Sequence, residues 1–408
     1  MCVLALLTIG VIMVSSAGMR VAAVSSAEQH LPDLTAQQII FSRSTCYMLL
    51  AVAAMGCGAL VPVRRLAGLA RATPERTLKF VGLGCAGLIA ICGLVYVPHL
   101  SRHMNGSHRW IELPVPGLGD ALSVQPSEIA KWAMIGLMAW YITARSKMIE
   151  EFWRGLVPAL ICIGGVAGFI VLEDLGTGVL IAMVACLMLL AGGARIRYFA
   201  TAVPIGVAGL VGAILMSPYR VKRVLAFMDP YADPQGIGYH TIQSLLAVSG
   251  GGGFGRGLGH GLQKFGYLPE DRTDFLFAII CEELGIAGAG LVIALFGALV
   301  WAGFAIMRKE REPVLKLLVM GIIATVGLQA IINLAVVTGL APTKGIALPL
   351  LSSGGTGWIL TAFSLGLLVA VDRSQDDAST GGLQPEVMDE ASVPFAAIEL
   401  KSSAPVAA

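Results

Sequence analysis

Apolar runs long enough to cross a membrane recur through this chain, from its first residue to about residue 371. A helix needs about 20 apolar residues to cross the hydrocarbon core, and only helices or closed barrels satisfy their backbone hydrogen bonds there. Charged residues make up 13% of the 408 residues, whereas ordinary soluble domains carry about 25%. The sequence therefore predicts an all-α polytopic membrane protein.

We expect about ten transmembrane helices in one domain, residues 1–372. The predicted spans are 1–18, 44–62, 80–98, 125–144, 156–173, 177–193, 199–217, 275–306, 315–337 and 356–372. Residues 1–18 lack the basic leading segment of a signal peptide, so they are counted as the first span. Residues 218–274 form a large loop between the seventh and eighth spans. The tail, residues 373–408, is rich in Ser, Ala, Asp, Glu and Pro without an apolar period, which predicts disorder.

Basic residues are concentrated in alternate short links between the spans. These links carry Arg64, Arg65, Arg71, Arg76 and Lys79, then Arg145, Lys147 and Arg154, then Arg195 and Arg197, then Arg308, Lys309, Arg311 and Lys316. The positive-inside rule places them in the cytoplasm, together with both termini. The loop at 218–274 then lies outside the cytoplasm. Its own basic residues, among them Arg223, Lys264 and Arg272, are explained by an anionic ligand on that side.

Charged residues also stand at the start of the fourth span. A charge inside a span costs at least about 2.5–3.5 kcal/mol, so it is a hypothesis for a functional site. Glu128 and Lys131 in "QPSEIAKWA" are three residues apart, so they share one helix face. They are either a pair that neutralises itself and makes insertion cheaper, or an acid and a cation that line a polar cavity.

Acidic residues cluster where the eighth span begins. The stretch "LPEDRTDF" carries Glu270, Asp271 and Asp274. If Asp271 or Thr273 caps the helix, Asp274 lies in the first turn, where the helix dipole favours a carboxylate. Capping accounts for one acid and not for three, so this segment is a candidate site.

Further acids lie in and between the spans. Glu282 and Glu283 are about 12–13 Å deeper in the eighth helix than Asp274, and we expect them to face other helices or water rather than lipid. Asp174, in "LEDLGTG" between the fifth and sixth spans, is either a cap of the next helix or a site residue.

Three loop segments add candidates for binding an amphiphile with a charged head. Arg109 and Trp110 combine a cation with an aromatic ring, although the membrane–water interface alone also explains the ring. Lys344 lies in a Pro- and Gly-rich stretch, 339–357, of a kind tolerated at membrane depth where it lines a cavity. The Gly-rich run at 249–261 lacks the GK[ST] ending and βαβ context of a phosphate loop. We interpret it as flexible backbone near a ligand and exclude ATP and NAD.

Other functional classes lack their sequence patterns. The eight cysteines stand singly in apolar stretches, and neither CxxC nor HExxH occurs, which argues against zinc. No basic tract or nucleic-acid motif is present, so no nucleic acid partner is expected.

The motifs resemble those of the SEDS family of peptidoglycan glycosyltransferases, the FtsW and RodA type. The matching stretches are "GSHRWI", "QPSEIAKWA", "EDLGTG", "AFMDPYADPQGIGYHTIQSLLAVSGGGGFGRGLGHGLQKFGYLPEDRTDFLFAIICEELG" and "NLAVVTGLAPTKGIALPLLSSGGTG". They follow the family order, and the resemblance implies ten spans with a large extracytoplasmic loop between the seventh and eighth. "PTKG" is closer to the FtsW branch, associated with division. Glu173 stands where the family usually has Pro, and "SGGT" at 353–356 stands where it usually has Tyr-Gly-Gly-Ser, which leaves the roles of Asp174 and the last loop open.

The resemblance implies a reaction. Lipid II, a disaccharide-pentapeptide on undecaprenyl diphosphate, is polymerised on the outer face of the bacterial cytoplasmic membrane when the acceptor's GlcNAc 4-hydroxyl attacks the donor's MurNAc anomeric carbon with inversion. Asp274 is the implied general base. The implied substrate-binding residues, which include the cations for the leaving diphosphate, are Arg109, Trp110, Glu128, Lys131, Arg223, Lys264, Arg272 and Lys344.

The resemblance further implies a class B penicillin-binding protein and other division proteins as partners, at the septum and among membrane lipids. A Mg²⁺ or Mn²⁺ requirement is a hypothesis, with Glu128 as a possible ligand. The alternative function is a flippase for lipid-linked precursors, because buried charges and broken helices also suit a transporter. The candidate polar residues cluster on one side of the membrane, which favours the enzyme, because a flippase should line both halves of its path. A protein that only recruits partners would leave the charges within the spans unexplained.

Overall fold

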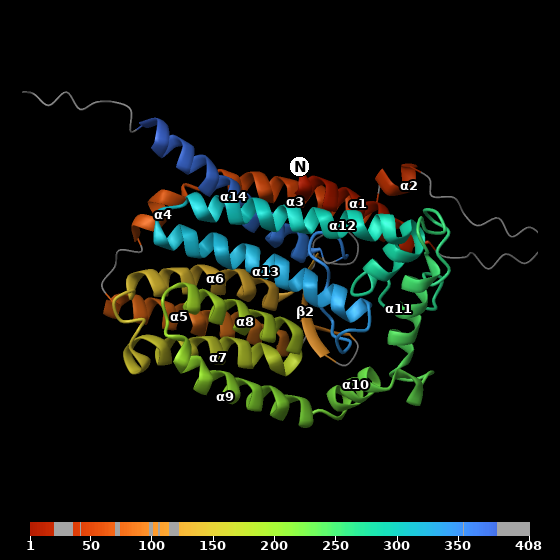
Figure 1. Cartoon of the computed structure of the whole chain (residues 1–408), viewed down its shortest axis with the longest axis horizontal. Helices are drawn as coiled ribbons and strands as arrows, with labels where there is room; N and C mark the ends of the chain where they lie inside the picture. Colours follow the sequence, from red (N-terminus) through yellow and green to blue (C-terminus); the bar gives the residue numbers. More distant parts are fainter. Residues whose placement is uncertain are drawn as a thin grey trace, which may run out of the picture.

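The computed structural model describes residues 1–19, 36–40, 42–69, 74–97, 101–104, 107–113, 122–353 and 355–381. Figure 1 shows a bundle of helices aligned with the long axis of the molecule, with short helices and a small sheet at one end. Neighbouring helices α6, α7, α8 and α13 pack against one another in this bundle. The core is therefore built from side chains between near-parallel helices.

Each of the ten predicted spans coincides with a helix. These are α1 (Cys2–Ala17), α3 (Arg43–Ala59), α5 (Pro74–Gly93), α6 (Pro126–Ala144), α7 (Val157–Glu173), α8 (Leu175–Ala191), α9 (Ile196–Leu215), α12 (Leu276–Lys309), α13 (Pro313–Val337) and α14 (Thr356–Gly381). Six helices within the described residues are long and apolar enough to cross a membrane, and α1 and α8 are apolar but shorter. The chain is thus a predominantly helical membrane protein.

The connecting segments contain structure of their own. They hold α2 (Ala36–Ile40), α4 (Val63–Leu69), η1 (Leu94–Tyr96), β1 (Ser101–Met104), β2 (Ser107–Leu113), β3 (Leu122–Val124), η2 (Phe152–Leu156), α10 (Pro218–Met228), η3 (Pro230–Ala232) and α11 (Tyr239–Gly250). The three strands form an antiparallel sheet in the order β1-β2-β3. The expectation of an all-α chain missed this sheet, because its strands are short and lack a long alternating pattern. The predicted loop 218–274 is partly helical.

Helices α3 and α14 approach each other through glycines. A Cβ atom at Gly58 would overlap the carbonyl oxygen of Phe363, and one at Gly366 would overlap that of Met55. Small residues let helix backbones come this close, which favours association inside a membrane. Helix α14 continues past the predicted end at 372 to Gly381, and the rest of the predicted disordered tail lies outside the described residues.

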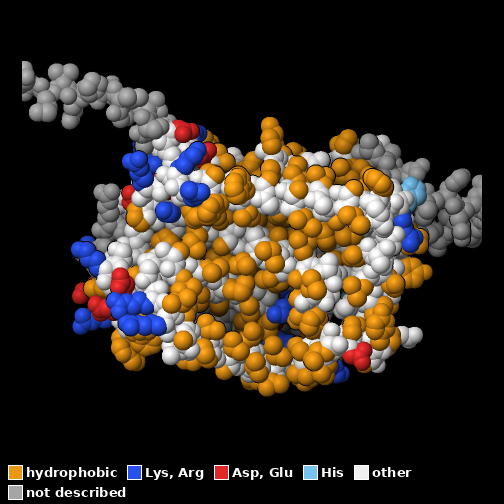
Figure 2. Space-filling view, in the orientation of Figure 1, with side chains coloured by type: hydrophobic (Ala, Val, Ile, Leu, Met, Phe, Trp, Pro, Cys, Tyr) orange, Lys and Arg blue, Asp and Glu red, His pale blue; other side chains and the backbone are white. Residues whose placement is uncertain are grey.

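The molecular surface separates apolar from basic regions. Hydrophobic side chains cover most of the face in Figure 2, while Lys and Arg gather at the end where α4 and the last turns of α14 lie. Helix α9 is the extreme case, since Phe199 is its one buried residue. A broad apolar surface with basic residues at one end is typical of a protein embedded in a bilayer.

Candidate active site

Asp274 lies just before α12 rather than inside it. The helix begins at Leu276 with Phe275 as N-cap, and no side chain caps it. The Thr273 hydroxyl instead donates to a carboxylate oxygen of Glu270, at 2.8 Å. The predicted capping by Asp271 or Thr273 is therefore wrong, and Asp274 belongs to the loop that precedes the helix.

Three separate segments meet at Asp274. Nδ2 of Asn333, in α13, donates to the backbone oxygens of Asp274 and Ile346, both at 2.8 Å. A Cβ atom at Gly345 would lie 3.1 Å from Nη1 of Arg109 and 3.2 Å from Oδ2 of Asp274. The β2 arginine, the Asp274 carboxylate and the loop before α14 therefore converge.

Opposing charges surround the Asp274 carboxylate. Although the residue is partly exposed, desolvation of its carboxyl group, together with the negative charges of Glu270 and Asp174, raises the pKa of Asp274 to about 7. Arg109 and Arg223 act in the opposite direction and limit this rise in pKa. A carboxyl group with a pKa near neutrality can exchange a proton efficiently at neutral pH.

Asp174 caps α8, as one of the two sequence interpretations expected. Its carboxylate accepts from the Thr177 backbone N–H at 3.2 Å and from the Thr177 hydroxyl at 2.7 Å. Gln125 Nε2 also donates to it, at 3.1 Å. Capping and proximity to Asp274 coexist, so one carboxylate both starts a helix and adds charge to the site.

A cavity opens beside these residues. Its space, about 320 Å³ including part of the open solvent, is lined by Cys92, Val95, Tyr96, Arg109, Pro126, Ser127, Phe169, Ile170, Glu173 and Asp174. Nε of Arg109 donates to the backbone oxygen of Glu173 at 3.0 Å, which fixes the guanidinium at the polar side. The cavity thus has the Arg109 guanidinium on one side and apolar side chains on another. Trp110 follows Arg109 in β2. Adjacent strand residues point to opposite faces of a sheet, so Arg109 and Trp110 do not face the same ligand.

Two more predicted cations lie near the loop before α14. Nη1 of Arg223 donates to the Thr343 backbone oxygen at 3.2 Å, and its guanidinium covers the ring of Tyr219. Lys344 comes next to Gly345, and burial lowers the pKa of its ammonium group. Within the described part of the chain, the Lys344 ammonium makes no hydrogen bond or ion pair, and only the backbone oxygen of Lys344 is bonded, to Ile346 N–H at 2.9 Å. Arg109, Arg223 and Lys344 are therefore the cations that the structure brings to the Asp274 region.

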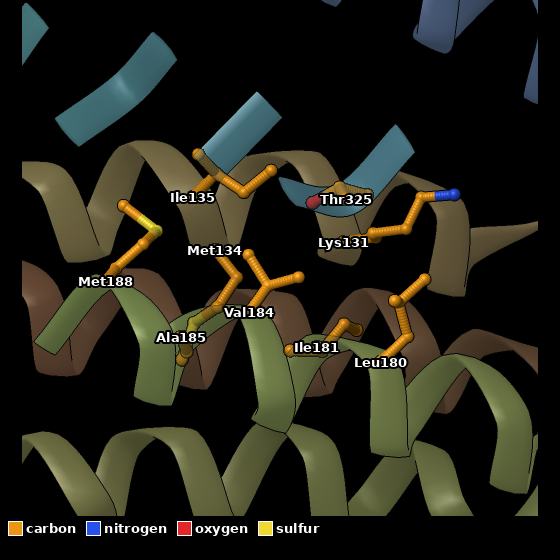
Figure 3. Close-up of a pocket in the computed structure, with 9 residues that line it drawn as sticks. All are labelled: Lys131, Met134, Ile135, Leu180, Ile181, Val184, Ala185, Met188 and Thr325. Carbon is orange, nitrogen blue, oxygen red and sulfur yellow. The ribbon is translucent and has the colours of Figure 1, made fainter. Parts of the chain in front are cut away.

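Lys131 is an interior residue. Its ammonium contacts both oxygens of Glu128, at 2.7 and 2.8 Å, and donates to Oε1 of Gln329 at 2.9 Å. Lys131 is 2% exposed and lies at one end of a cavity of about 220 Å³ whose other lining is mostly apolar (Figure 3). The self-neutralising pair is thus present, and it borders a mainly apolar cavity rather than a polar one.

The side chains of Lys264 and Arg272 bond to other parts of the chain than the Asp274 carboxylate. The Lys264 ammonium is 3% exposed, and it contacts Glu283 at 2.7 Å and the Ser16 hydroxyl at 3.0 Å. Arg272 donates to the backbone oxygen of Gly18 at 3.1 Å. Lys264 supplies the counter-charge that the buried Glu283 carboxylate requires, and Arg272 adds a hydrogen bond to the residue that follows α1.

The Gly-rich run binds the chain's own glutamates. Backbone N–H groups of Leu262 and Gln263 donate to the Glu282 carboxylate at 2.8 and 3.1 Å. Those of Gly259 and Gly261 donate to Glu283 at 3.0 and 3.4 Å. The run is thus packed against α12 through these bonds, and its closeness to a ligand stays a prediction. The expectation that both glutamates avoid lipid is confirmed by their burial.

Helix α12 is broken where this run docks. Gly285 has φ 65° and ψ −162°, and the freed N–H of Ile286 donates to the Gly252 oxygen at 3.0 Å. Cβ atoms at Gly251 and Gly255 would overlap the carbonyl oxygens of Cys281 and Glu283. Glycine is therefore required for direct backbone contact between the run and α12.

The sequence reading missed Gln329 and Asn333. They lie one turn apart in α13, and Gln329 Nε2 donates to the Ala347 oxygen at 2.8 Å. Their signal was present, because amide side chains inside an apolar span are costly and need partners. Their partners belong to a loop that sequence spacing alone does not place.

The described residues do not form an evident metal cage. They contain no group of three or more His, Cys, Asp or Glu side chains arranged to hold an ion. The carboxylate of Glu128, the possible ligand, is taken by Lys131. The described residues therefore do not by themselves provide a complete metal site.

Comparison with known proteins identifies the family. A family model for FtsW, RodA and SpoVE, described as a cell cycle protein, matches residues 1–377. The chain belongs to the FtsW/RodA/SpoVE family. Among relatives of this family, Stage V sporulation protein E of Bacillus subtilis (strain 168) is 43% identical over 281 residues, covering 69% of this chain and 75% of the relative. A probable peptidoglycan glycosyltransferase FtsW of Trichlorobacter lovleyi is 35% identical and covers 90% of this chain and 91% of its own length.

Solved structures agree with the fold. A chain from "Structural coordination of polymerization and crosslinking by a peptidoglycan synthase complex" matches with a TM-score of 0.64 and 26% identity, over 92% of this chain and 96% of that one. RodA of Thermus thermophilus matches with a TM-score of 0.54 and 22% identity, over 92% and 95%. The RodA likeness supports the fold alone.

Proposed function

We propose that this protein polymerises lipid II into glycan strands by inverting glycosyl transfer. The observation that carries the proposal is Asp274, a carboxylate of raised pKa beside Arg109. Family membership supports it, as does the naming of several relatives as probable peptidoglycan glycosyltransferases. Likeness to FtsW relatives favours a role in septal wall synthesis.

In this mechanism Asp274 is the general base. Its carboxylate accepts the proton of the acceptor's GlcNAc 4-hydroxyl while that oxygen bonds to the donor's MurNAc anomeric carbon. The bond from that carbon to the diphosphate oxygen breaks on the opposite side, so the configuration inverts. Proton removal by a positioned base contributes about 10²–10⁴-fold to such rates.

The cations near Asp274 suit the leaving diphosphate. Arg109, Arg223 and Lys344 can stabilise the negative charge that develops as undecaprenyl diphosphate departs. The cavity beside Arg109 also has an apolar side, which suits the first part of a lipid tail. Lys131 is buried and does not contact the diphosphate directly in this scheme. It supports the loop before α14 through Gln329, which bonds to the Ala347 oxygen.

A Mg²⁺ or Mn²⁺ requirement stays a prediction. Mg²⁺ is commonly held by substrate phosphates and only one or two carboxylates, so the diphosphate itself would supply part of the site. Titration with a chelator, followed by restoration with each metal, tests this requirement.

We further propose how the protein lies in the bacterial cytoplasmic membrane. Ten spans place residues 218–274 outside, with the basic end, both termini and the tail at 373–408 in the cytoplasm. A class B penicillin-binding protein and other division proteins are the proposed partners. Likeness to a chain of a complex that couples polymerization to crosslinking supports the first of them.

The decisive experiment measures glycan products from labelled lipid II, with purified protein in detergent and the class B partner present. We expect long strands from the unmodified protein and a loss of about 10²–10⁴-fold in Asp274→Asn, a variant of the same size. Glu150→Gln, an exposed change at the basic end, is the control. Lipid translocation in proteoliposomes without any polymer would instead establish the flippase.

A further inference from the structure

Two amide side chains of α13 connect the Asp274 segment to the helix bundle. Gln329 and Asn333 are four residues apart, so they lie one above the other on the same face. Gln329 holds the Ala347 oxygen and accepts from Lys131. Asn333 holds the Ile346 and Asp274 oxygens. Asn333 is therefore the α13 amide that bonds to the Asp274 backbone directly.

Asn333 is poorly suited to a purely space-filling role. It is 1% exposed, and its hydrogen bonds to Asp274 and Ile346 both use the single atom Nδ2. Its Oδ1 is buried without a hydrogen-bond partner in the described part of the chain. An unsatisfied buried polar atom costs roughly 1–3 kcal/mol, and an apolar residue of similar size would avoid that cost.

We propose that Asn333 is a positioning residue for glycosyl transfer, fixing the Asp274 segment against the loop that carries Lys344. The inference rests on the proposed function and deepens it. Asn333 does not touch the reacting atoms. It joins the segment bearing the base to the segment bearing a diphosphate-binding cation, so the two keep a constant separation during the reaction.

The expected size of the effect follows from geometry. Displacing a reacting group by about 1 Å can cost about 100-fold in rate. Without Asn333 Nδ2, the Asp274 backbone oxygen loses its hydrogen bond to α13, and the Asp274 segment can move toward water. The rate constant kcat should then fall much more than KM rises, because Arg109 is held independently by its bond to the Glu173 backbone oxygen.

A shift in pH dependence separates positioning from general damage. The groups that face Asp274 or adjoin it are Arg109 from β2, Asp174 between α7 and α8, Arg223 from α10, Glu270, Asp271 and Arg272 from its own loop, Lys344 before α14, and His240 from α11, which stacks on Phe275. Desolvation is the largest cause of the raised pKa. A carboxyl group released toward water should therefore lose its proton at lower pH.

The test compares three α13 variants with the unmodified protein in the lipid II assay. For Asn333→Leu we expect kcat to fall about 100-fold, KM to change less than about threefold, and the acidic limb of the kcat profile to move down by about half to one pH unit. Gln329→Met releases the same loop but not Asp274, so its acidic limb should stay in place. Thr325→Val removes a hydroxyl that bonds within its own helix, at 2.7 Å, and should match the unmodified protein.

The outcomes are distinct. An Asn333→Leu protein with unmodified kcat, or with reduced kcat but an unmoved acidic limb, would overturn the positioning role. If Asn333→Leu fails to elute as a folded protein, Asn333→Ser, whose hydroxyl can keep one of the two bonds, provides the same pH comparison. Absence of polymer from the unmodified protein would instead reject the proposed function itself.

Discussion

Asp274 is held between groups that pull its proton affinity in opposite directions. Burial and two neighbouring acids raise its pKa, and two arginines lower it. A general base works best when its pKa is near the working pH, since it must be deprotonated and still hold a proton firmly. The neighbouring charged residues that set the pKa of Asp274 are therefore as important for its role as a base as the carboxylate itself.

Neutralising Glu270 should change the pH dependence of polymerisation in a defined direction. The base form of Asp274 predominates only above its pKa of about 7, so activity should fall as the pH drops through that value. Glu270 raises this pKa, so Glu270→Gln should lower it and shift the acidic limb to lower pH. Rates measured from about pH 5 to about pH 9 test this, since they bracket the pKa. An unmoved limb, or the same shift in Glu150→Gln, would contradict it.

Lys264 should matter for stability rather than for binding lipid II. Lys264→Met leaves the buried Glu283 without its ion pair, which costs about 3–5 kcal/mol. Arg256→Gln removes a 41% exposed partner of Glu282 at 3.8 Å, and should cost less than about 1 kcal/mol. Thermal unfolding in detergent measures both. A Lys264→Met protein of normal stability with a raised KM would restore the substrate-binding assignment.

At the scale of elements, the Gly-rich run and the broken start of α12 form one unit. The run supplies N–H groups to Glu282 and Glu283, and the helix break at Gly285 lets Ile286 and Ala287 donate back to it. Buried carboxylates are tolerated when their lone pairs are satisfied. The run precedes the segment that carries Asp274 and the start of α12 follows it, so the unit anchors that segment at both ends.

Glycine positions in this run should differ sharply in their tolerance of a methyl group. Gly251→Ala would push Cβ into the Cys281 carbonyl oxygen, whereas a Cβ at Gly253 meets nothing within 4 Å. Overpacking of this kind costs about 1–3 kcal/mol or more, and it should separate the run from α12. Melting temperatures of Gly251→Ala and Gly253→Ala make the comparison. Equal values would show that the run does not contact the helix as described.

At the scale of the whole molecule, charge and apolar surface set the orientation. Basic residues gather at one end (Figure 2), while β2 and α11 lie toward the other end (Figure 1). Asp274 is close to both elements, through Arg109 of β2 and through its neighbour Phe275, which stacks on His240 of α11. From the positive-inside rule we expect the Asp274 end to lie outside the cytoplasm. Lipid II polymerisation on the outer face requires this arrangement.

Cysteine labelling should confirm that orientation. In a background without the eight native cysteines, Gln235→Cys should react with an impermeant maleimide added outside intact cells. Lys147→Cys should react only after the membrane is opened. Both positions are exposed, so burial does not limit the reaction. The reverse pattern would place Asp274 in the cytoplasm and exclude the proposed reaction.

The sequence by itself determined the positions of the helices, because a run of about 20 apolar residues is a local signal that a bilayer enforces. It also identified the capping role of Asp174, since a cap bonds within a few residues of itself. It selected the segment containing Asp274, because one cap does not account for three acids. The short sheet at 101–124 escaped notice, since its strands are held by pairing between segments.

Only the tertiary structure decided which charges work together. Lys264 looked equivalent to Arg223 in the sequence, but it pairs with Glu283 and the distant Ser16. Asn333 looked like an ordinary polar residue of a span, but it reaches Asp274 and Ile346. The physical reason is that a buried charge or amide takes the partner that packing places within about 3 Å, and chain spacing does not encode that distance.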